Sequence, residues 1–209
     1  MFFSFRSQAF LLPCLIAGLL SLSACSVPTK IVANAPANAP AKQQILIVSI
    51  QEQKLLFIED GVEVNRYRIS SAKNGIGDTP DSYQTPAGLM EVTEKFGIGL
   101  PLGSVLKDRQ LTGEIIPIDA PGRDPIVSRI LWLRGLEEGN RNAYQRFIYI
   151  HGTPQESLLG TPVSFGCIRM SSNDIISLYE RIQPGAKVWV GEQALDQEKL
   201  RWLTEKSHN

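Results

Sequence analysis

From residue 45 to residue 191 the chain is a succession of short apolar runs separated by turns, and this pattern constrains the fold more than any other feature. The runs are dense in β-branched and aromatic residues, which favour strands, and each is long enough for one strand only. Asp60-Gly61 separates two runs and predicts a hairpin turn. The strand candidates are 45–50, the two arms of that hairpin, 88–95, 126–135, 146–153 and 186–191. Many short strands predict a mainly β domain built as a sandwich of sheets or a barrel.

Helices are predicted in two places. Residues 171–182 begin with capping serines and carry apolar residues at helical spacing. Residues 195–206 form a candidate C-terminal helix within a tail of residues 192–209. Residues 96–125 are rich in Gly and Pro and lack a clear period, which is typical either of a lid over a binding site or of a surface insertion.

Residues 1–24 are predicted to be an export signal. Arg6 is the only charged residue before an almost wholly apolar run from Ala9 to Leu20. That run is too short to cross a bilayer core, which needs about 20 residues, but it suits the apolar region of a signal peptide. The small residues Ser23 and Ala24 favour cleavage after Ala24.

Cys25 follows the expected cut, and Leu22-Ser23-Ala24-Cys25 resembles a bacterial lipobox. The resemblance implies that Cys25 is lipidated, and two or more acyl chains anchor a protein stably to a membrane. Ser26 follows instead of Asp, which by the same resemblance indicates the outer membrane, with the protein in the periplasm. The alternative is a plain secretory signal that is discarded together with Cys25. Residues 25–43 are rich in Ala, Pro and Asn and are expected to be the lipidated cysteine and a flexible tether.

The charge balance argues against a nucleic-acid partner. The chain has 21 basic and 21 acidic residues and no net charge, so no general attraction to polyanions is expected. The length of 209 residues fits one folded domain with a tail, which we place at residues 44–191 and expect to be a monomer.

Cys167 is the one cysteine expected to remain as a free thiol. The chain has three cysteines, of which Cys14 leaves with the signal and Cys25 is assigned to lipid. In an oxidising compartment Cys167 then has no intramolecular disulfide partner. It is either a buried, inert residue that behaves as a small hydrophobe or a nucleophile.

His151 is the candidate partner of this thiol. The chain has two histidines, and His208 lies next to the C-terminus. A nucleophilic thiol needs a base or a cation close by, and an imidazole provides either near neutral pH. The second ring nitrogen needs an acceptor to fix its tautomer; Thr153, Ser164 and a local backbone carbonyl are the candidates.

The neighbours of Cys167 also fit a reactive site. Gly166 lets backbone come close to a substrate. Backbone N–H groups would converge on the thiol if the loop after Cys167 curls directly into the helix that begins near Ser171. Arg169 is suited to a carboxylate, either of a substrate or in a structural ion pair.

The segments HGT at 151–153 and SFGCIRM at 164–170 together resemble the signature of the L,D-transpeptidase (YkuD-type) catalytic domain. The strand-rich start near residue 45, the Thr85-Pro86-Ala87-Gly88 turn and the spacing from His to Cys also fit that family. The resemblance covers about residues 45–191. It implies a mixed β-sandwich with a small helix after the catalytic cysteine.

The resemblance also implies roles for single residues. Cys167 would be the nucleophile and His151 the base. The residues implied to shape the substrate or oxyanion region are Gly166, Arg169, Ser164, Thr153 and Gly152. Phe165 departs from the pattern, since many relatives have His before the Gly-Cys pair and some have Lys. No metal or organic cofactor is implied, and one Cys with one His cannot supply a closed zinc site of about four ligands.

The reaction implied is acyl transfer on peptidoglycan stem peptides. Cys167 would attack the carbonyl of the third residue of a tetrapeptide, and the terminal D-Ala would leave. The acceptor is left open: a second stem gives a 3→3 crosslink, an outer-membrane lipoprotein gives a tether, and water gives a tripeptide through carboxypeptidase activity.

Other interpretations are weaker. A sortase also uses His, Cys and Arg, but by resemblance its His and Cys lie farther apart. Cell-wall peptidases of the other Cys/His type place Cys before His. A non-catalytic lipoprotein that binds peptidoglycan would carry an inert Cys167, and such a module would not be acylated by a carbapenem, as members of the family are expected to be.

Overall fold

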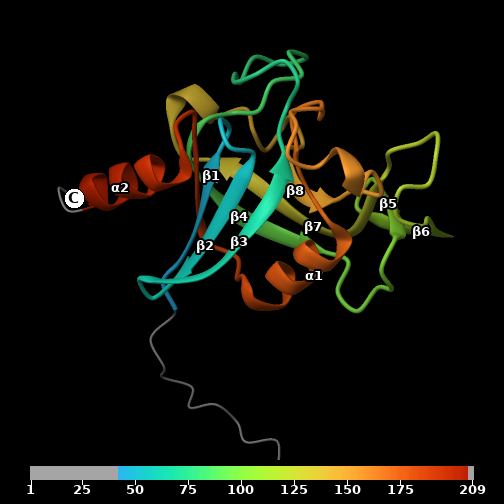
Figure 1. Ribbon diagram of the computed structural model, residues 1–209. Helices are drawn as coiled ribbons and strands as arrows, with labels where there is room; N and C mark the ends of the chain where they lie inside the picture. Colours follow the sequence, from blue (N-terminus) through green and yellow to red (C-terminus); the bar gives the residue numbers. More distant parts are fainter. Residues whose placement is uncertain (1–41, 207–209) are drawn as a thin grey trace, which may run out of the picture. The chain divides into compact units, whose positions relative to one another are not determined.

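The computed structural model describes residues 42–206. These residues form ten strands, two α-helices and two short 3-10 turns (Figure 1). In chain order the elements are β1 (Gln44–Ser49), β2 (Lys54–Glu59), β3 (Val62–Ser70), β4 (Gly88–Phe96), β5 (Ser104–Lys107), β6 (Gln110–Ile115), β7 (Ile126–Gly135), η1 (Glu138–Asn140), β8 (Tyr149–Gly152), η2 (Glu156–Leu158), β9 (Ile168–Met170), α1 (Ser172–Arg181), β10 (Lys187–Gly191) and α2 (Leu195–Lys206).

The strands form one sheet that closes on itself. Its order is β4-β10-β1-β2-β3-β9-β8-β7-β5-β6, and β4 pairs with β7 as well as with β10. The additional pairing joins β4, β10, β1, β2, β3, β9, β8 and β7 into a ring, with β5 and β6 extending from β7. Most pairs are antiparallel, but β1 runs parallel to β10 and β8 runs parallel to β9. A closed sheet leaves no free edges within the ring, so the mainly β prediction is confirmed as a barrel-like sandwich.

The main hydrophobic core fills the inside of this closed sheet. Alternate residues of the strands point inward, as Leu46 and Val48 of β1 and Ile150 of β8 do. Helix α1 adds Ile175 and Leu178, both fully buried, to the same core. Ser171 caps this helix by accepting a hydrogen bond from the Asp174 N–H at 3.1 Å, as the sequence predicts.

The two outer faces of the sheet differ, and each is given a name here. The α2 face is the outer side of β1, β2 and β10; Ile45, Ile47 and Trp189 pack there against Leu195 of α2. Figure 1 shows α2 (red) beside β1, at the side of the domain away from β5 and β6. The thiol face is the outer side of β7, β8 and β9, where Cys167 packs in a cluster with Trp132 and Tyr149. Because both sides of β1 are covered, its sequence is a continuous apolar run instead of an alternating one.

The predicted elements and the structure agree in most places. The hairpin at Asp60-Gly61 is confirmed, with positive φ angles of 51° and 81°. The predicted strand at 146–153 is shorter in the structure, where β8 covers only the last part of that range.

The helix begins near Ser171 as predicted, but the segment between Cys167 and α1 does not meet the condition for bringing its N–H groups to the thiol. It does not curl directly into the helix, because β9 intervenes as a short strand paired with both β3 and β8. The N-terminus of α1 therefore does not lie at the thiol, and its backbone N–H groups cannot favour the thiolate as the sequence suggested.

The segment 96–125 is partly ordered as a hairpin. β5 and β6 pair with each other, and β5 also pairs with β7. β5 is mostly buried whereas β6 is exposed along its length.

The predicted signal, Cys25, most of the tether and His208 lie outside the described residues. Among residues 42–206 no helix combines the length and the apolarity needed to cross a membrane.

Candidate active site

The pairing of β8 with β9 positions the candidate site. The two strands are parallel, with His151 opposite Arg169. Cys167 lies one residue before β9, so the same register places it beside Tyr149. Since side chains alternate along a strand, Tyr149, His151, Cys167 and Arg169 all point to the thiol face. His151 and Cys167 are therefore diagonal neighbours on one face of two adjacent strands.

The Cys167 side chain is half-buried and keeps an opening to solvent. Its Sγ donates to the Phe147 carbonyl at 3.4 Å and accepts from the Tyr149 N–H at 3.4 Å. Burial raises the pKa of the thiol to about 11, and the Tyr149 N–H and the charge of Arg169 oppose this rise only partly. Cys167 is therefore a neutral thiol at pH 7, accessible but not pre-ionised.

His151 is almost fully buried at the end of β8. Its Nδ1 lies 2.9 Å from the Gly152 carbonyl oxygen. A carbonyl only accepts, so Nδ1 carries the proton and Nε2 carries the lone pair. Of the three acceptors that the sequence offers, the backbone carbonyl is the one used. Burial also lowers the pKa of His151 to about 4, with a further lowering by Arg169 that Asp124 opposes. The imidazole is thus a neutral acceptor at pH 7.

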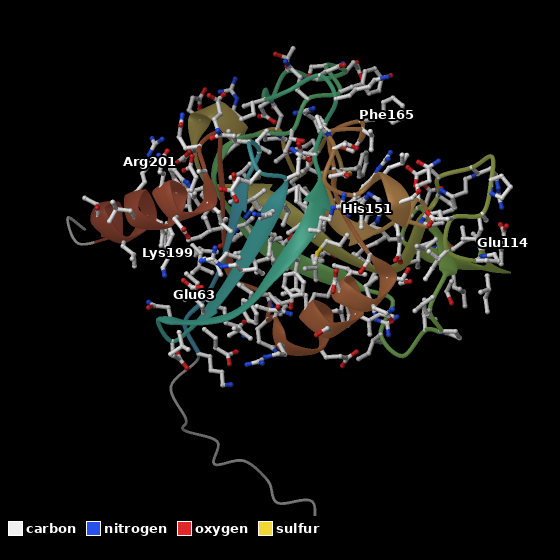
Figure 2. All side chains as sticks on the ribbon, in the orientation of Figure 1. Glu63, Glu114, His151, Phe165, Lys199 and Arg201 are labelled. Carbon is white, nitrogen blue, oxygen red and sulfur yellow. The ribbon has the colours of Figure 1, made fainter. Side chains whose placement is uncertain are left out.

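In this structure Cys167 and His151 share a face but no hydrogen bond. Within residues 42–206 the hydrogen bonds of the thiol are those with Phe147 and Tyr149. Catalytic hydrogen bonds often form fully only when substrate is bound. Figure 2 shows His151 set within the fold, whereas Phe165 projects at its outer edge.

Ser164 and Gly166 shape the loop that carries the thiol. The Ser164 hydroxyl donates to the Cys167 carbonyl at 2.5 Å and accepts from the Gly166 N–H at 3.2 Å. Gly166 has a φ of +129°, which a residue with a side chain rarely adopts. The Gly166 N–H already has an acceptor, so the predicted oxyanion role of Gly166 gains no support from a free donor. Thr85 holds the loop from the other side by donating to the Gly166 carbonyl at 2.9 Å.

Gly152 and Thr153 also have structural contacts. A Cβ on Gly152 would lie 2.5 Å from the Val127 carbonyl oxygen, so only glycine lets β7 pass this close. Thr153 is fully buried, and its hydroxyl donates to Asp124 Oδ1 at 2.5 Å. Both residues thus hold the end of β8 in place, and their roles toward substrate stay predictions.

Arg169 is buried and pairs with a carboxylate of the same chain. Its guanidinium lies 2.6 Å from Asp124 Oδ2. Thr153 and Arg169 thus meet at one residue, Asp124, which the sequence did not single out. Asp119, earlier in the same segment, accepts from the Ser157 N–H at 2.9 Å. The end of the 96–125 segment is therefore fastened to the strand ends beside His151. These contacts favour the interpretation of residues 96–125 as a lid over the site instead of a loose surface insertion.

Asp124, Arg146 and Thr85 are the functional candidates that sequence reasoning missed. Arg146 precedes β8, and its guanidinium binds the segment 77–84 (below). No periodic pattern marks these residues, because each acts through a partner at least 29 positions away in the sequence. The one local signal was the Thr-Pro-Ala-Gly turn that begins with Thr85.

Comparison with known proteins identifies the family. A model of the L,D-transpeptidase catalytic domain (YkuD) matches residues 43–190, which is more than half of the chain. The protein belongs to this family. The probable L,D-transpeptidase YcfS of Escherichia coli strain K12 is 28% identical over 153 residues, which make up 71% of this chain and 44% of YcfS. The chain therefore spans less than half the length of that relative.

Solved structures of L,D-transpeptidases resemble the domain more distantly. One from Mycobacterium tuberculosis H37Rv is 22% identical with a TM-score of 0.49, covering 72% of this chain and 58% of its own. L,D-transpeptidase 3 from Mycobacterium tuberculosis, in complex with a faropenem-derived adduct, is 23% identical with a TM-score of 0.48, covering 72% and 61%.

Proposed function

We propose that this protein is a peptidoglycan L,D-transpeptidase in which Cys167 is the nucleophile and His151 the general base. The observation that carries the proposal is the placement of an accessible thiol and a neutral imidazole as diagonal neighbours on the thiol face. The substrate is a tetrapeptide stem, attacked at the carbonyl of its third residue. Membership of the family supports this choice of substrate.

The acylation step starts from two neutral groups. As Sγ forms a bond to the substrate carbonyl carbon, its proton passes to His151 Nε2, which carries the lone pair because Nδ1 is held by Gly152. The developing imidazolium is stabilised by the Gly152 carbonyl and by Asp124. When the C–N bond to D-Ala breaks, His151 returns the proton to the leaving amine. A thioester on Cys167 remains.

The second half of the reaction consumes the thioester. An amine attacks the same carbonyl, the C–S bond breaks, and the thiol of Cys167 is regenerated. An amine on a second stem gives a 3→3 crosslink, and an amine on an outer-membrane lipoprotein gives a tethered envelope. Attack by water gives a tripeptide instead, so transfer and hydrolysis compete for one intermediate.

The proposed setting is the periplasm, with the protein anchored through lipid on Cys25. The support is the Leu22-Ser23-Ala24-Cys25 sequence and the apolar run before it. Mass spectrometry of the mature N-terminal peptide tests this directly, since a diacylated Cys25 gives a mass that an unmodified or later N-terminus does not.

The activity itself is tested with purified disaccharide-tetrapeptide and the full-length protein in detergent. We expect loss of D-Ala and formation of a new dimer, both absent with Cys167→Ala. Loss of D-Ala with only tripeptide formed would reduce the proposal to carboxypeptidase activity. No release of D-Ala, together with no acylation of Cys167 by a carbapenem, would overturn the enzyme and favour a peptidoglycan-binding module.

A further inference from the structure

A pocket of about 280 Å³ opens beside the Cys167 thiol. Its wall combines three aromatic residues, one carboxylate and one guanidinium. We call it the aromatic pocket; the lining residues used here are Asp81, Tyr83, Arg146, Phe147, Phe165 and Cys167.

The aromatic side chains of this pocket are unusually exposed. Tyr83 is 55% exposed, Phe147 is 50% and Phe165 is 60%. Among residues 42–206 these are the three exposed aromatic side chains, and all of them line this pocket. Exposed apolar surface that gathers at one place typically marks a binding site, whereas scattered exposure needs no explanation.

The backbone of the pocket is held in a strained conformation. Asp81, Tyr83 and Phe147 have φ angles of 61°, 56° and 56°, in the left-handed region that residues with side chains seldom adopt. Such conformations cost about 1–3 kcal/mol each and persist where the surrounding structure enforces them, most often at functional sites.

The side chain of Arg146 holds the backbone of this pocket in place. Its guanidinium donates to the carbonyls of Gly77 and Gln84, to Ser82 Oγ, and to Asp78 Oδ1, with which it also forms a buried ion pair at 3.1 Å. One side chain thus fixes the segment 77–84 against the residues before β8. The walls of the pocket are therefore set before any ligand arrives.

The charged side chains in and beside the pocket include Asp81, Arg146, Lys73 and Arg109. The positive charge of Arg146 is matched by Asp78. Asp81 lines the pocket and, within the described part of the chain, forms no ion pair. Cations of the chain lie over two of the rings, Lys73 over Phe165 at 4.7 Å and Arg109 over Phe147 at 5.4 Å. An unmatched carboxylate beside ring faces that accept cations is suited to a group of the alkylammonium type.

Phe165 already attracts an ammonium group of this chain. The Lys73 Nζ lies 4.7 Å from the centroid of the Phe165 ring, and Lys73 is not a lining residue of the pocket. Tyr83 meets the same ring edge-on, with centroids 5.9 Å apart. An edge-on neighbour and a lysine on one ring show that Phe165 is placed to interact with cations.

We propose that the aromatic pocket binds the acceptor, and that Asp81, Tyr83 and Phe165 recognise its alkylammonium group. This inference rests on the proposed function, since it names the acceptor of that reaction as a primary amine that is charged in solution. The acyl thioester of Cys167 and the ammonium give an amide, the free thiol of Cys167 and one released proton. Two protons leave the nitrogen, one passing to sulfur and one to solvent, as the C–N bond forms and the C–S bond breaks.

The test separates transfer from hydrolysis of the same thioester. Full-length protein in detergent receives the disaccharide-tetrapeptide donor and either Nα-acetyl-lysine amide, which is a charged amine at pH 7, or hydroxylamine, which is a neutral one. For Asp81→Asn and Phe165→Ala we expect the ratio of lysine adduct to tripeptide to fall about tenfold. Release of D-Ala and transfer to hydroxylamine should stay as in the wild type. Phe165→Trp, which keeps a ring face, should restore the ratio.

Two matched controls lie outside the pocket. Glu192→Gln removes another exposed carboxylate, and Ile98→Ala removes another exposed apolar side chain, 78% exposed. Both variants should leave the ratio of lysine adduct to tripeptide and the transfer to hydroxylamine unchanged. The proposal is overturned if the pocket variants leave the lysine ratio unchanged, or if they lower hydroxylamine transfer and D-Ala release to the same extent. Absence of D-Ala release by the wild type would be a failure of the proposed function itself.

Discussion

The α2 face and the thiol face are outer sides of the same closed sheet, yet their buried carboxylates have different partners. On the α2 face the buried carboxylate of Glu198 accepts from Trp189 Nε1 and from the Gln193 N–H, each at 2.7 Å. At the thiol face the buried carboxylate of Asp124 is instead paired with a charged group, the Arg169 guanidinium, which lies 2.6 Å from Oδ2. The first face is covered by α2 and uses neutral donors, whereas the second is open at the half-buried Cys167 and uses an ion pair.

The backbone beside the thiol face is strained within a strand. β7 bulges at Ser128, which has a φ of +66° and lies across from the His151–Gly152 step. The Ser128 hydroxyl accepts from the Gly103 N–H and donates to Ser172, so the bulge joins the 96–125 segment to α1. Backbone strain costs stability, and it gathers at functional sites. We therefore assign the stability of the domain mainly to the α2 face and the proposed chemistry to the thiol face.

The largest effect that separates the faces is expected from His151→Gln. Loss of the base should lower the rate of D-Ala release by about 10²–10⁴, because the thiol has a raised pKa and its other acceptor, the Phe147 carbonyl, cannot serve as a base. The melting temperature at pH 7 should change little. A rate within a few fold of the wild type would show that His151 is not the base.

Trp189→Ala tests the opposite face. Trp189 is buried between the sheet and α2, so truncation should lower the free energy of unfolding by about 3–5 kcal/mol. Well below the melting temperature the rate per folded molecule should be unchanged. Urea denaturation together with kinetics at low temperature measures both, and a loss of rate without a loss of stability would contradict the separation of the faces.

The acid sensitivity of the domain should come from the thiol face. Burial lowers the pKa of His151 from 6.5 to about 4. Between these values the unfolded chain binds a proton that the folded chain does not, so stability is full above pH 6.5 and falls as the pH drops. The expected loss from pH 7.5 to pH 5 is about 2 kcal/mol.

His151→Gln should remove most of this slope, and denaturant titrations at the two pH values measure it. The carboxylate of Glu59, whose pKa is lowered to about 2 chiefly by its hydrogen bond from Gln44, does not titrate in this window. An equal slope in the wild type and the variant would assign the acid sensitivity elsewhere.

Asp124→Asn is expected to have a smaller effect on both stability and activity. The amide can still accept from Thr153, but the charge of Arg169 is left unmatched, which should cost about 1–3 kcal/mol. Since Asp124 raises the pKa of His151, the acidic limb of the pH–rate profile should move to lower pH.

Asp119→Asn is the matched control, because Asp119 fastens the same segment through the Ser157 N–H. It should leave the acidic limb in place. Identical profiles for the two variants would mean that Asp124 acts only as a structural contact.

The sequence predicted what depends on local pattern. Strands with apolar runs, the Asp60-Gly61 hairpin and the Ser171 cap follow from residue type and spacing, and the structure confirms them. The closure of the sheet through β4 and β7 has no local signal, because it depends on pairing between distant strands. β9 has only three residues, which is too short for a periodic pattern, and for that reason the sequence left open whether the loop after Cys167 curls directly into the helix.

The candidate site was predictable only in part. Cys167 and His151 were found from residue chemistry and family resemblance, and the register of β8 and β9 places them on one face. Ser164, Gly152 and Thr153 were assigned to the substrate or oxyanion region; the structure gives their contacts within the chain, and their roles toward substrate stay predictions. Asp124 and Arg146 could not be predicted, since an isolated charged residue in a loop is indistinguishable from a solvated one until its partner is known.

The measurement that tests the central claim most directly is the mass of the acyl-enzyme. Full-length protein is mixed with disaccharide-tetrapeptide, quenched in acid within a turnover and analysed as intact protein and as peptides. The account predicts an adduct of the donor minus D-Ala, carried by Cys167 and absent from Cys167→Ala. It also predicts that His151→Gln forms the same adduct more slowly. Release of D-Ala without an adduct on Cys167, or with an adduct on another residue, would contradict the account.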